Sequence, residues 1–443
     1  MNKPTSVTLP TRRSRSTWIV LCAALAVTLS ACSSSSSGNS TSSAAGESSS
    51  SAGSSSSSAG PVSCTGVSAP CSATASPATG SAIRVGVATI ENDPIGDFTS
   101  AALGVQAATK YLNEHGGISG HEVKLDICPM KSTSGGDVCA NSFVSDRDVA
   151  VILGISTLDN EIFPILKSAG IPVLGGSPLT PVDSVDDGNH WEFSGGPLSE
   201  LFAMPSYAVS QLHIKSAVIV QPAAANGPTL TSFAQASLKK NGVTDVKVVE
   251  GPAATADPTS TLVQVNASHP DAIFFEYNPP ACATVMKDIK LLGITAKTFY
   301  FSSCNETEVL QATGSASNGV YTPADQLLTA FAPDNPQVKF FVAAMNAAGY
   351  GNKISDVLGD LGFQAAMNFY AAADEIGADN LNGSSINAYF AGTDNKPSWL
   401  ADTYSCANPP LPAVSKSLCA SSERIVQIQD GKLVDVGGKW YSS

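Results

Sequence analysis

The segment from Ile83 to Cys128 constrains the fold more than any other part of the chain. Residues 83–88 form an apolar run with β-branched residues, which is typical of a buried strand. A helix is expected over residues 99–115, because apolar residues recur there on one face, and Gly116-Gly117 ends it. Residues 123–127 alternate as a second strand. This βαβ pattern predicts a parallel α/β sheet, in which ligands bind beyond the carboxyl ends of the strands.

The alternation of strand and helix patterns occurs in two successive groups along the chain. Strands are expected at residues 83–88, 123–127, 149–153 and 171–174 in the first group, and at residues 216–220, 246–249, 272–275 and 298–301 in the second. Two such groups predict two Rossmann-like, doubly wound α/β lobes.

The end of the chain does not repeat this alternation. From Pro336 the sequence is mostly helical, and it closes with two strand patterns across Asp430-Gly431, a favoured two-residue hairpin turn. An all-helical segment cannot form a βα lobe by itself, so we expect it to cover the first lobe and the final strands to join the second. The predicted lobes are residues 82–203 with 325–420, and residues 204–324 with 421–443.

Residues 1–31 have the pattern of a secretory signal peptide. Basic residues between Arg12 and Arg15 precede an apolar run that is too short to span a bilayer as a helix. The run ends in Leu29-Ser30-Ala31-Cys32, which resembles the lipobox of bacterial lipoproteins, where the Cys is acylated. An ordinary signal peptide with a chance Cys is the alternative. Residues 32–81 are Ser-rich and predict a disordered tether, so we expect an exported protein anchored through Cys32 to the outer face of the cytoplasmic membrane.

Eight cysteines lie outside the predicted signal peptide and the anchor position. An even number of cysteines in an exported protein suggests disulfides. Connectivity cannot be deduced from the sequence, but pairing of sequence neighbours predicts Cys64–Cys71, Cys128–Cys139, Cys282–Cys304 and Cys406–Cys419. Metal ligation is the alternative. Because there is no Cys-x-x-Cys and the five His are scattered, we expect no metal site, and we expect no cofactor.

The formal net charge of the chain is −13. Four of the basic residues precede residue 33 and no acidic residue does, so the exported part is more acidic still. This balance argues against nucleic acid or anionic lipid as a partner of the folded part.

Several segments resemble one known family. Residues 84–87, the helix end Tyr111–Gly120 with its Asn-Glu-x-Gly-Gly-Ile-x-Gly sequence, and residues 123–125 are similar to the opening of the periplasmic branched-chain amino-acid-binding proteins. These are type I solute receptors of ABC importers. Residues 149–173 are similar to the family's next two strand ends, and Gly362–Ala365 to a late helix, so the resemblance covers most of residues 83–391.

The resemblance implies two lobes joined by three crossovers, with the ligand held between lobes that close by hinge motion. It implies a receptor, expected to be monomeric, that performs no chemistry and delivers a small polar ligand to the membrane subunits of an ABC permease. Branched-chain or other amino acids are the first ligand class. Amides, urea-like compounds and small carboxylates are alternatives, as is a ligand-sensing lipoprotein of the same fold.

The resemblance also implies where the ligand is bound. In the family, Ser and Thr hydroxyls and backbone amides of the first lobe hold the amino acid's carboxylate, while acidic and aromatic residues of the second lobe hold the ammonium group. The residues expected at the ligand, by position, are Ser156, Thr157, Ser177, Tyr277, Asn278 and Glu306, with Asp97 and Phe363 as further candidates. For Ser and Thr at helix starts, a capping role is the alternative.

The chain departs from the family pattern at two positions that bear on the ligand. Leu179 stands where the family has Thr, and the family's acidic partner of the ammonium group falls near Ser303. Either Glu306 or Glu276 could replace that acid, or the ligand is not an α-amino acid. An extracellular hydrolase is a distant alternative, because the sequence lacks Gly-x-Ser-x-Gly, His-Glu-x-x-His and the P-loop motif.

Overall fold

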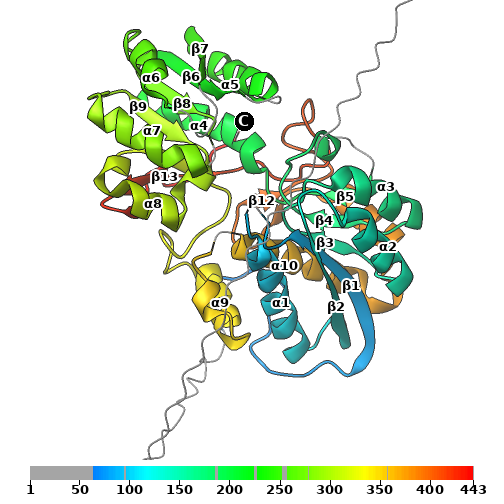
Figure 1. Ribbon diagram of the computed structural model, residues 1–443. Helices are drawn as coiled ribbons and strands as arrows, with labels where there is room; N and C mark the ends of the chain where they lie inside the picture. Colours follow the sequence, from blue (N-terminus) through cyan, green and yellow to red (C-terminus); the bar gives the residue numbers. More distant parts are fainter. Residues whose placement is uncertain are drawn as a thin grey trace, which may run out of the picture. The chain divides into compact units, whose positions relative to one another are not determined.

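The computed structural model describes residues 63–93, 96–184, 188–223, 227–251, 257–277, 279–356 and 358–442 (Figure 1). The predicted signal peptide, Cys32 and Asn278 lie outside the described residues.

The first of two large sheets is parallel, with the order β2-β1-β3-β4-β5. Its strands are β1 (Gly80–Ile90), β2 (His121–Met130), β3 (Val151–Leu153), β4 (Val173–Gly175) and β5 (His190–Trp191). The second half of β1 is buried without interruption, because the strand is internal and helices cover both faces.

Helices from both ends of the chain cover this sheet. They are α1 (Thr99–Glu114), α2 (Gly136–Asp146), α3 (Asp159–Ala169), α9 (Pro336–Ala347), α10 (Gly359–Ile376) and α11 (Gly383–Ala391). One hydrophobic core combines side chains of β1, α1, α9, α10 and α11. The late helical segment therefore packs on the first lobe, as expected from its pattern.

α1 and α10 lie side by side (Figure 1) and approach closely at two glycines. A Cβ atom at Gly104 would stand 1.9 Å from the carbonyl oxygen of Gly359, and one at Gly362 would stand 1.9 Å from that of Ala101. Only glycine permits this backbone contact.

The second sheet has the order β14-β13-β10-β9-β8-β6-β7. Its strands are β6 (Ser216–Pro222), β7 (Asp245–Gly251), β8 (Ala272–Phe275), β9 (Lys297–Tyr300), β10 (Tyr321–Ala324), β13 (Arg424–Gln429) and β14 (Lys432–Asp435). Rings at matched register stack across neighbouring strands, with centroids of Phe274 and Phe299 4.7 Å apart and those of Phe299 and Tyr321 5.0 Å apart. β13 and β14 pair antiparallel across Asp430-Gly431, which confirms the predicted hairpin.

The second lobe's helices are α4 (Gly196–Leu212), α5 (Gly227–Lys240), α6 (Thr259–Asn266), α7 (Pro279–Leu291) and α8 (Thr307–Thr313). A separate short pair, β11 (Lys396–Pro397) with β12 (Thr403–Tyr404), lies in the last part of the chain. A parallel sheet and a mixed sheet, both flanked by helices, confirm the predicted α/β architecture.

The predicted tether boundary at residue 81 is wrong, because residues from 63 onward already pack on the first lobe. The Trp399 indole Nε1–H donates to the Ala69 carbonyl at 2.7 Å, and the Tyr111 hydroxyl donates to the Ser72 carbonyl at 2.8 Å. Two aromatic donors and the Cys64–Cys71 disulfide thus fix a stretch whose composition resembles a linker.

The structure contains the four disulfides that neighbour pairing predicts: Cys64–Cys71, Cys128–Cys139, Cys282–Cys304 and Cys406–Cys419. Within the described residues, none of the helices combines the length and apolar character needed to cross a bilayer.

Candidate functional site

The loops at the carboxyl ends of the parallel strands are where such a fold binds ligands. On the first sheet these loops follow β1, β3 and β4, and on the second they follow β8 and β9. They contain the described residues predicted at the ligand except Phe363, which lies in α10.

Ser156 and Thr157 lie between β3 and α3. The Ser156 hydroxyl accepts the backbone N–H of Leu158 at 3.0 Å and donates to the carboxyl group of Asp159. The exposed Thr157 hydroxyl donates to the Ser132 carbonyl at 2.8 Å. Both side chains therefore have structural partners in addition to their position at a strand end.

Ser177 follows β4 and lies over the start of α4. A Cβ atom at Gly196 would stand 2.0 Å from the Ser177 hydroxyl oxygen, and Gly196 has a φ of +45°. Glycine at this position lets the Ser177 hydroxyl lie against the N-terminal end of α4. The backbone N–H groups there already have partners, because Gly196 donates to the Ser194 hydroxyl and Leu198 and Ser199 donate to the Gly195 carbonyl.

Asp97 is exposed and stabilises its own loop. Its carboxylate accepts the backbone N–H of Asn92 at 3.1 Å and the hydroxyl of Thr99 at 2.5 Å. The pKa of Asp97 is lowered from its usual value, chiefly by the hydrogen bond from the Thr99 hydroxyl. These bonds fit a capping acid at the start of α1.

Tyr277 is 2% exposed, and its hydroxyl oxygen would lie 2.0 Å from a Cβ atom at Gly251. Burial raises the pKa of Tyr277 to about 12. The sulfur atoms of the Cys282–Cys304 disulfide lie 3.9 and 3.5 Å from the Tyr277 carbonyl oxygen, so this bridge joins the two strand-end loops of the second lobe.

Glu276 lies directly before Tyr277 and is 5% exposed. One carboxylate oxygen accepts the hydroxyl of Thr231 in α5 at 2.7 Å, while Oε1 has no hydrogen-bond partner among the described residues. Burial raises the pKa of Glu276 to about 7. Glu276 is therefore a buried carboxyl group at the end of β8 with one oxygen left for a further hydrogen-bond donor.

Glu306 and Phe363 differ in their surroundings. Glu306 is half-buried at the start of α8. Its pKa is raised mainly by burial and to a lesser extent by the neighbouring charge of Glu308. Phe363 is fully buried, with its ring centroid 5.2 Å from that of Phe341 and 5.9 Å from that of Trp399. The structure thus places Phe363 in the core of the first lobe.

Buried carboxyl groups at the crossovers between the lobes are functional candidates that the sequence analysis missed. The Ser194 hydroxyl donates to Asp325, and the Ser199 hydroxyl donates to Glu423. Glu200 accepts the backbone N–H of Ser302 at 3.0 Å.

These bonds join all three crossovers, because Ser194, Asp325 and Glu423 belong to different connections between the sheets. Burial raises the pKa of Glu200 to about 8, and the charge of Asp325 contributes. The pKa of Glu423 is raised well above its usual range by burial and by Asp325 and Glu200.

A second acidic group lies beyond β3, β4 and β5 in the first lobe. Burial and the neighbouring Asp183 raise the pKa of Asp159 to about 7. Burial, Asp183 and Asp159 raise the pKa of Glu192 well above its usual range. The signal for these acids in the sequence was weak, since isolated Asp and Glu next to polar loops are usually exposed.

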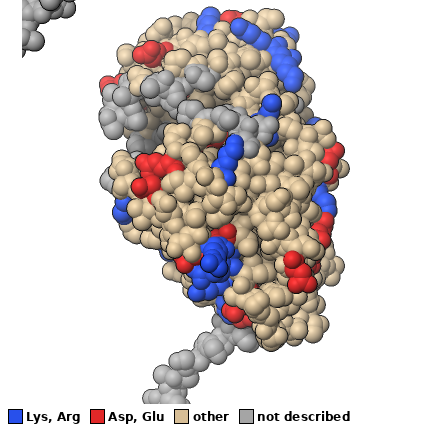
Figure 2. Space-filling view, turned by 90° about the vertical axis from the view of Figure 1, so that its right-hand side faces the viewer, with Lys and Arg blue, Asp and Glu red and all other residues tan. Residues whose placement is uncertain are grey.

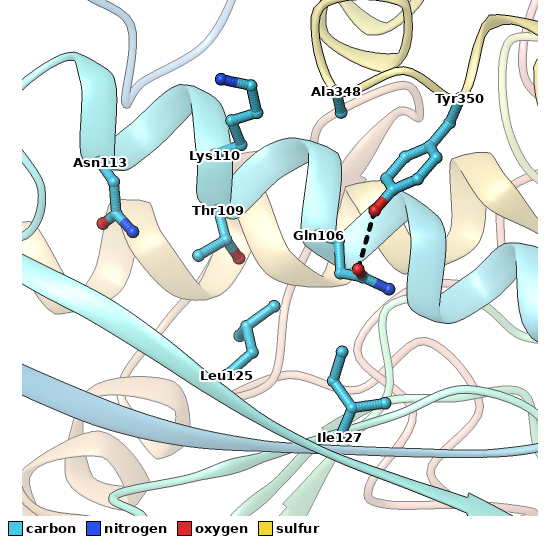
Figure 3. A pocket seen from close by; sticks show the side chains of 8 residues that line it. All are labelled: Gln106, Thr109, Lys110, Asn113, Leu125, Ile127, Ala348 and Tyr350. Atoms are coloured by element: carbon cyan, nitrogen blue, oxygen red, sulfur yellow. Dashed lines mark hydrogen bonds between the residues drawn. The ribbon is translucent and has the colours of Figure 1, made fainter.

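A separate hollow of about 310 Å³ lies between α1, β2 and the turn after α9 (Figure 3). Leu125 and Ile127 of β2 line it, and the Tyr350 hydroxyl donates to Gln106 at 2.8 Å. It includes none of the residues predicted at the ligand.

On the face in Figure 2, basic and acidic side chains form small, interspersed groups. No group of three or more His, Cys, Asp and Glu that could hold a metal ion occurs within the described ranges.

Comparisons with known proteins agree with this arrangement. The family model described as periplasmic binding protein matches residues 82–393. No match was found among curated protein sequences.

Solved structures share the fold at low sequence identity. The leucine-binding protein LivK of Thermotoga maritima is 18% identical, with 81% of this chain and 98% of that chain covered and a TM-score of 0.61. LivJ of Streptococcus pneumoniae in complex with isoleucine is 15% identical (82% and 99% covered, TM-score 0.60). A fatty-acid ABC transporter substrate-binding protein of Thermomonospora curvata is 14% identical (84% and 95% covered, TM-score 0.62).

These proteins have the two-lobed type I periplasmic binding fold that the two sheets of this chain form. Since the family model spans well over half of the sequence, the chain belongs to the periplasmic binding protein family.

Proposed function

We propose that this protein is the extracytoplasmic solute-binding receptor of an ABC importer, anchored through a lipid on Cys32. The observation that carries the proposal is the family match over residues 82–393, together with two sheets whose parallel strands end in loops that contain polar residues. In this reading the ligand binds between the lobes, and the closed form is presented to the membrane subunits of the permease. A ligand closes the lobes only if it binds the closed state better than the open one.

The ligand contacts that we propose are Ser156, Thr157 and Ser177 from the first lobe, and Tyr277, Asn278 and Glu306 from the second. We add Glu276, because its carboxyl group is buried at a strand end and has one unpaired oxygen among the described residues. Asp97 and Phe363 are not retained, because the former caps its own loop and the latter fills the core.

Amino acids are the first ligand class that the comparisons support, through the similarity to LivK and LivJ. The similarity to a fatty-acid receptor makes aliphatic carboxylates the second class to test. A ligand sensor of the same fold would share the binding chemistry and differ only in its membrane partner.

A thermal-shift screen of the purified protein tests the proposal. The panel contains amino acids, amides, amines, fatty acids and small carboxylates. A ligand at 100 times its dissociation constant adds about 2.7 kcal/mol to the free energy of unfolding, which raises the melting temperature measurably. Absence of any shift over the whole panel would refute solute capture. Ser156→Ala should weaken binding of the ligand found while the protein stays folded, and unchanged affinity would remove Ser156 from the site.

A further inference from the structure

Besides Asp183, five carboxyl side chains that are at most 5% exposed lie at the carboxyl ends of the two sheets or on the crossovers: Asp159, Glu192, Glu200, Glu276 and Glu423. Asp159 starts α3 after β3, Glu192 follows β5, and Glu276 follows β8. Glu423 precedes β13, whose start is at the same edge because β13 runs antiparallel to β10. None of the five forms an ion pair with Lys or Arg in the described part of the chain.

Basic residues gather at the opposite edges of the sheets. Lys167, Lys239, Lys240 and Lys290 are in the last turns of α3, α5 and α7, which end at the amino edges of the strands. Three bases near the carboxyl edges have partners of their own: Lys131 donates to the Glu91 carbonyl at 2.7 Å, Lys353 pairs with Asp356 close to Asp97, and Arg424 pairs with Asp435. The exposed Lys416 lies between Ser415 and Ser417, which bond to the backbone of Asp183 and Glu192.

Four of the five have an oxygen atom without a hydrogen-bond donor within the described ranges, a property that they share with Asp126 and Asp148, which lie beside Arg84 instead. Asp159 Oδ1, Glu192 Oε2, Glu276 Oε1 and Glu423 Oε2 are buried and have no hydrogen-bond partner among the described residues. A buried carboxyl oxygen without a donor is costly, and a cationic ligand group would satisfy it.

Glu276 is the best placed of these to meet a ligand. It follows the internal strand β8, and its backbone N–H donates to the Val220 carbonyl of β6 at 3.2 Å. Thr231 holds one carboxyl oxygen and leaves Oε1 open. Asp159 and Glu423, by contrast, each interact with a second buried acid.

We propose that the cleft selects a ligand of net positive charge, an organic amine or guanidinium compound, with Glu276 as the partner of the cationic group. This inference rests on the proposed receptor function. A free carboxylate would meet buried acids on both lobes, whereas the described bases nearest these edges either have partners of their own or, like Lys416, are exposed to solvent. A zwitterion would gain one ion pair and meet repulsion at its other end.

Two charge series with matched carbon skeletons test the inference by isothermal titration calorimetry. The first is 3-methylbutylamine, leucine and 4-methylpentanoate; the second is putrescine, 4-aminobutyrate and succinate. We expect the tightest ligand to be an amine, with at least tenfold weaker binding of the zwitterion and the carboxylate of the same series. Glu276→Gln should reduce the amine's affinity tenfold or more.

Asp245→Asn is the matched control, because Asp245 is exposed at the start of β7 in the same lobe, and it should change affinity less than twofold. Tighter binding of a zwitterion or a carboxylate would overturn the charge selection and leave the receptor function standing. Unchanged affinity in Glu276→Gln would overturn the assignment of Glu276. Absence of binding in both series would overturn the inference. The proposed receptor function would be refuted only if the broader thermal-shift panel also finds no ligand.

Discussion

Replacing Glu276 with Gln should change how stability depends on pH by an amount that follows from its burial. The pKa of this carboxyl group rises from 4.5 to about 7 on folding, because burial disfavours the charged form. Between these two values the folded state holds a proton that the unfolded state has released. The stabilising contribution is therefore complete below pH 4.5 and is lost as the pH rises through about 7.

The interval between the two pKa values corresponds to roughly 3 kcal/mol, at 1.36 kcal/mol per pH unit. Gln keeps the shape of the side chain and an acceptor for the Thr231 hydroxyl but has no proton to release. Relative to Glu276→Gln, the wild-type protein should therefore lose roughly 3 kcal/mol of unfolding free energy between pH 4.5 and pH 8.

Urea denaturation at the two pH values, with the disulfides kept oxidised, measures this difference. Asp245→Asn serves as the exposed control in the same sheet. A difference between wild type and Glu276→Gln that stays constant with pH would refute the account of Glu276 as a carboxyl group whose pKa is raised by burial on folding.

Three further changes have expected outcomes. Gly104→Ala should destabilise the protein by about 1–3 kcal/mol, because the new Cβ would stand 1.9 Å from the Gly359 carbonyl oxygen. Gly392→Ala is the control, since the nearest atom to its new Cβ is 3.5 Å away. If urea denaturation shows that Gly104→Ala loses no more unfolding free energy than Gly392→Ala, the prediction is wrong. Phe363→Ala should cost about 3–5 kcal/mol of unfolding free energy, since this ring is fully buried in the first lobe; weaker ligand binding without destabilisation would instead return Phe363 to the site. Replacing Cys282 and Cys304 with Ser removes a disulfide that spans 22 residues. The loss of this cross-link should lower the unfolding free energy by about 3 kcal/mol, because the unfolded chain gains loop entropy. Urea denaturation measures the difference, and equal stability of the two proteins would contradict the prediction.

Local patterns predicted much of the fold. The periodicity around residues 83–128 and the Asp430-Gly431 turn are determined by neighbours in sequence, so β1, α1, β2 and the final hairpin lie where expected. β5 and β10 were missed. β5 has two residues, and β10 contains Pro323, which argues against a strand within a sheet.

The site was harder to predict because its buried acids depend on distant partners. Glu423 is paired with Ser199, which lies 224 residues away, and Glu200 with Ser302, 102 residues away. Nothing in the local sequence distinguishes these acids from exposed ones. The same limit applies to Phe363, whose place on a helix face is equally compatible with core or cleft until its neighbours Phe341 and Trp399 are known.

The most direct test of the receptor function is small-angle X-ray scattering of the protein with and without a saturating amount of the tightest ligand found by calorimetry or thermal shift. Closure of two lobes on a ligand predicts a smaller radius of gyration in the bound state. An unchanged scattering curve with ligand bound would contradict the account, because binding would then occur without the closure that a permease could recognise.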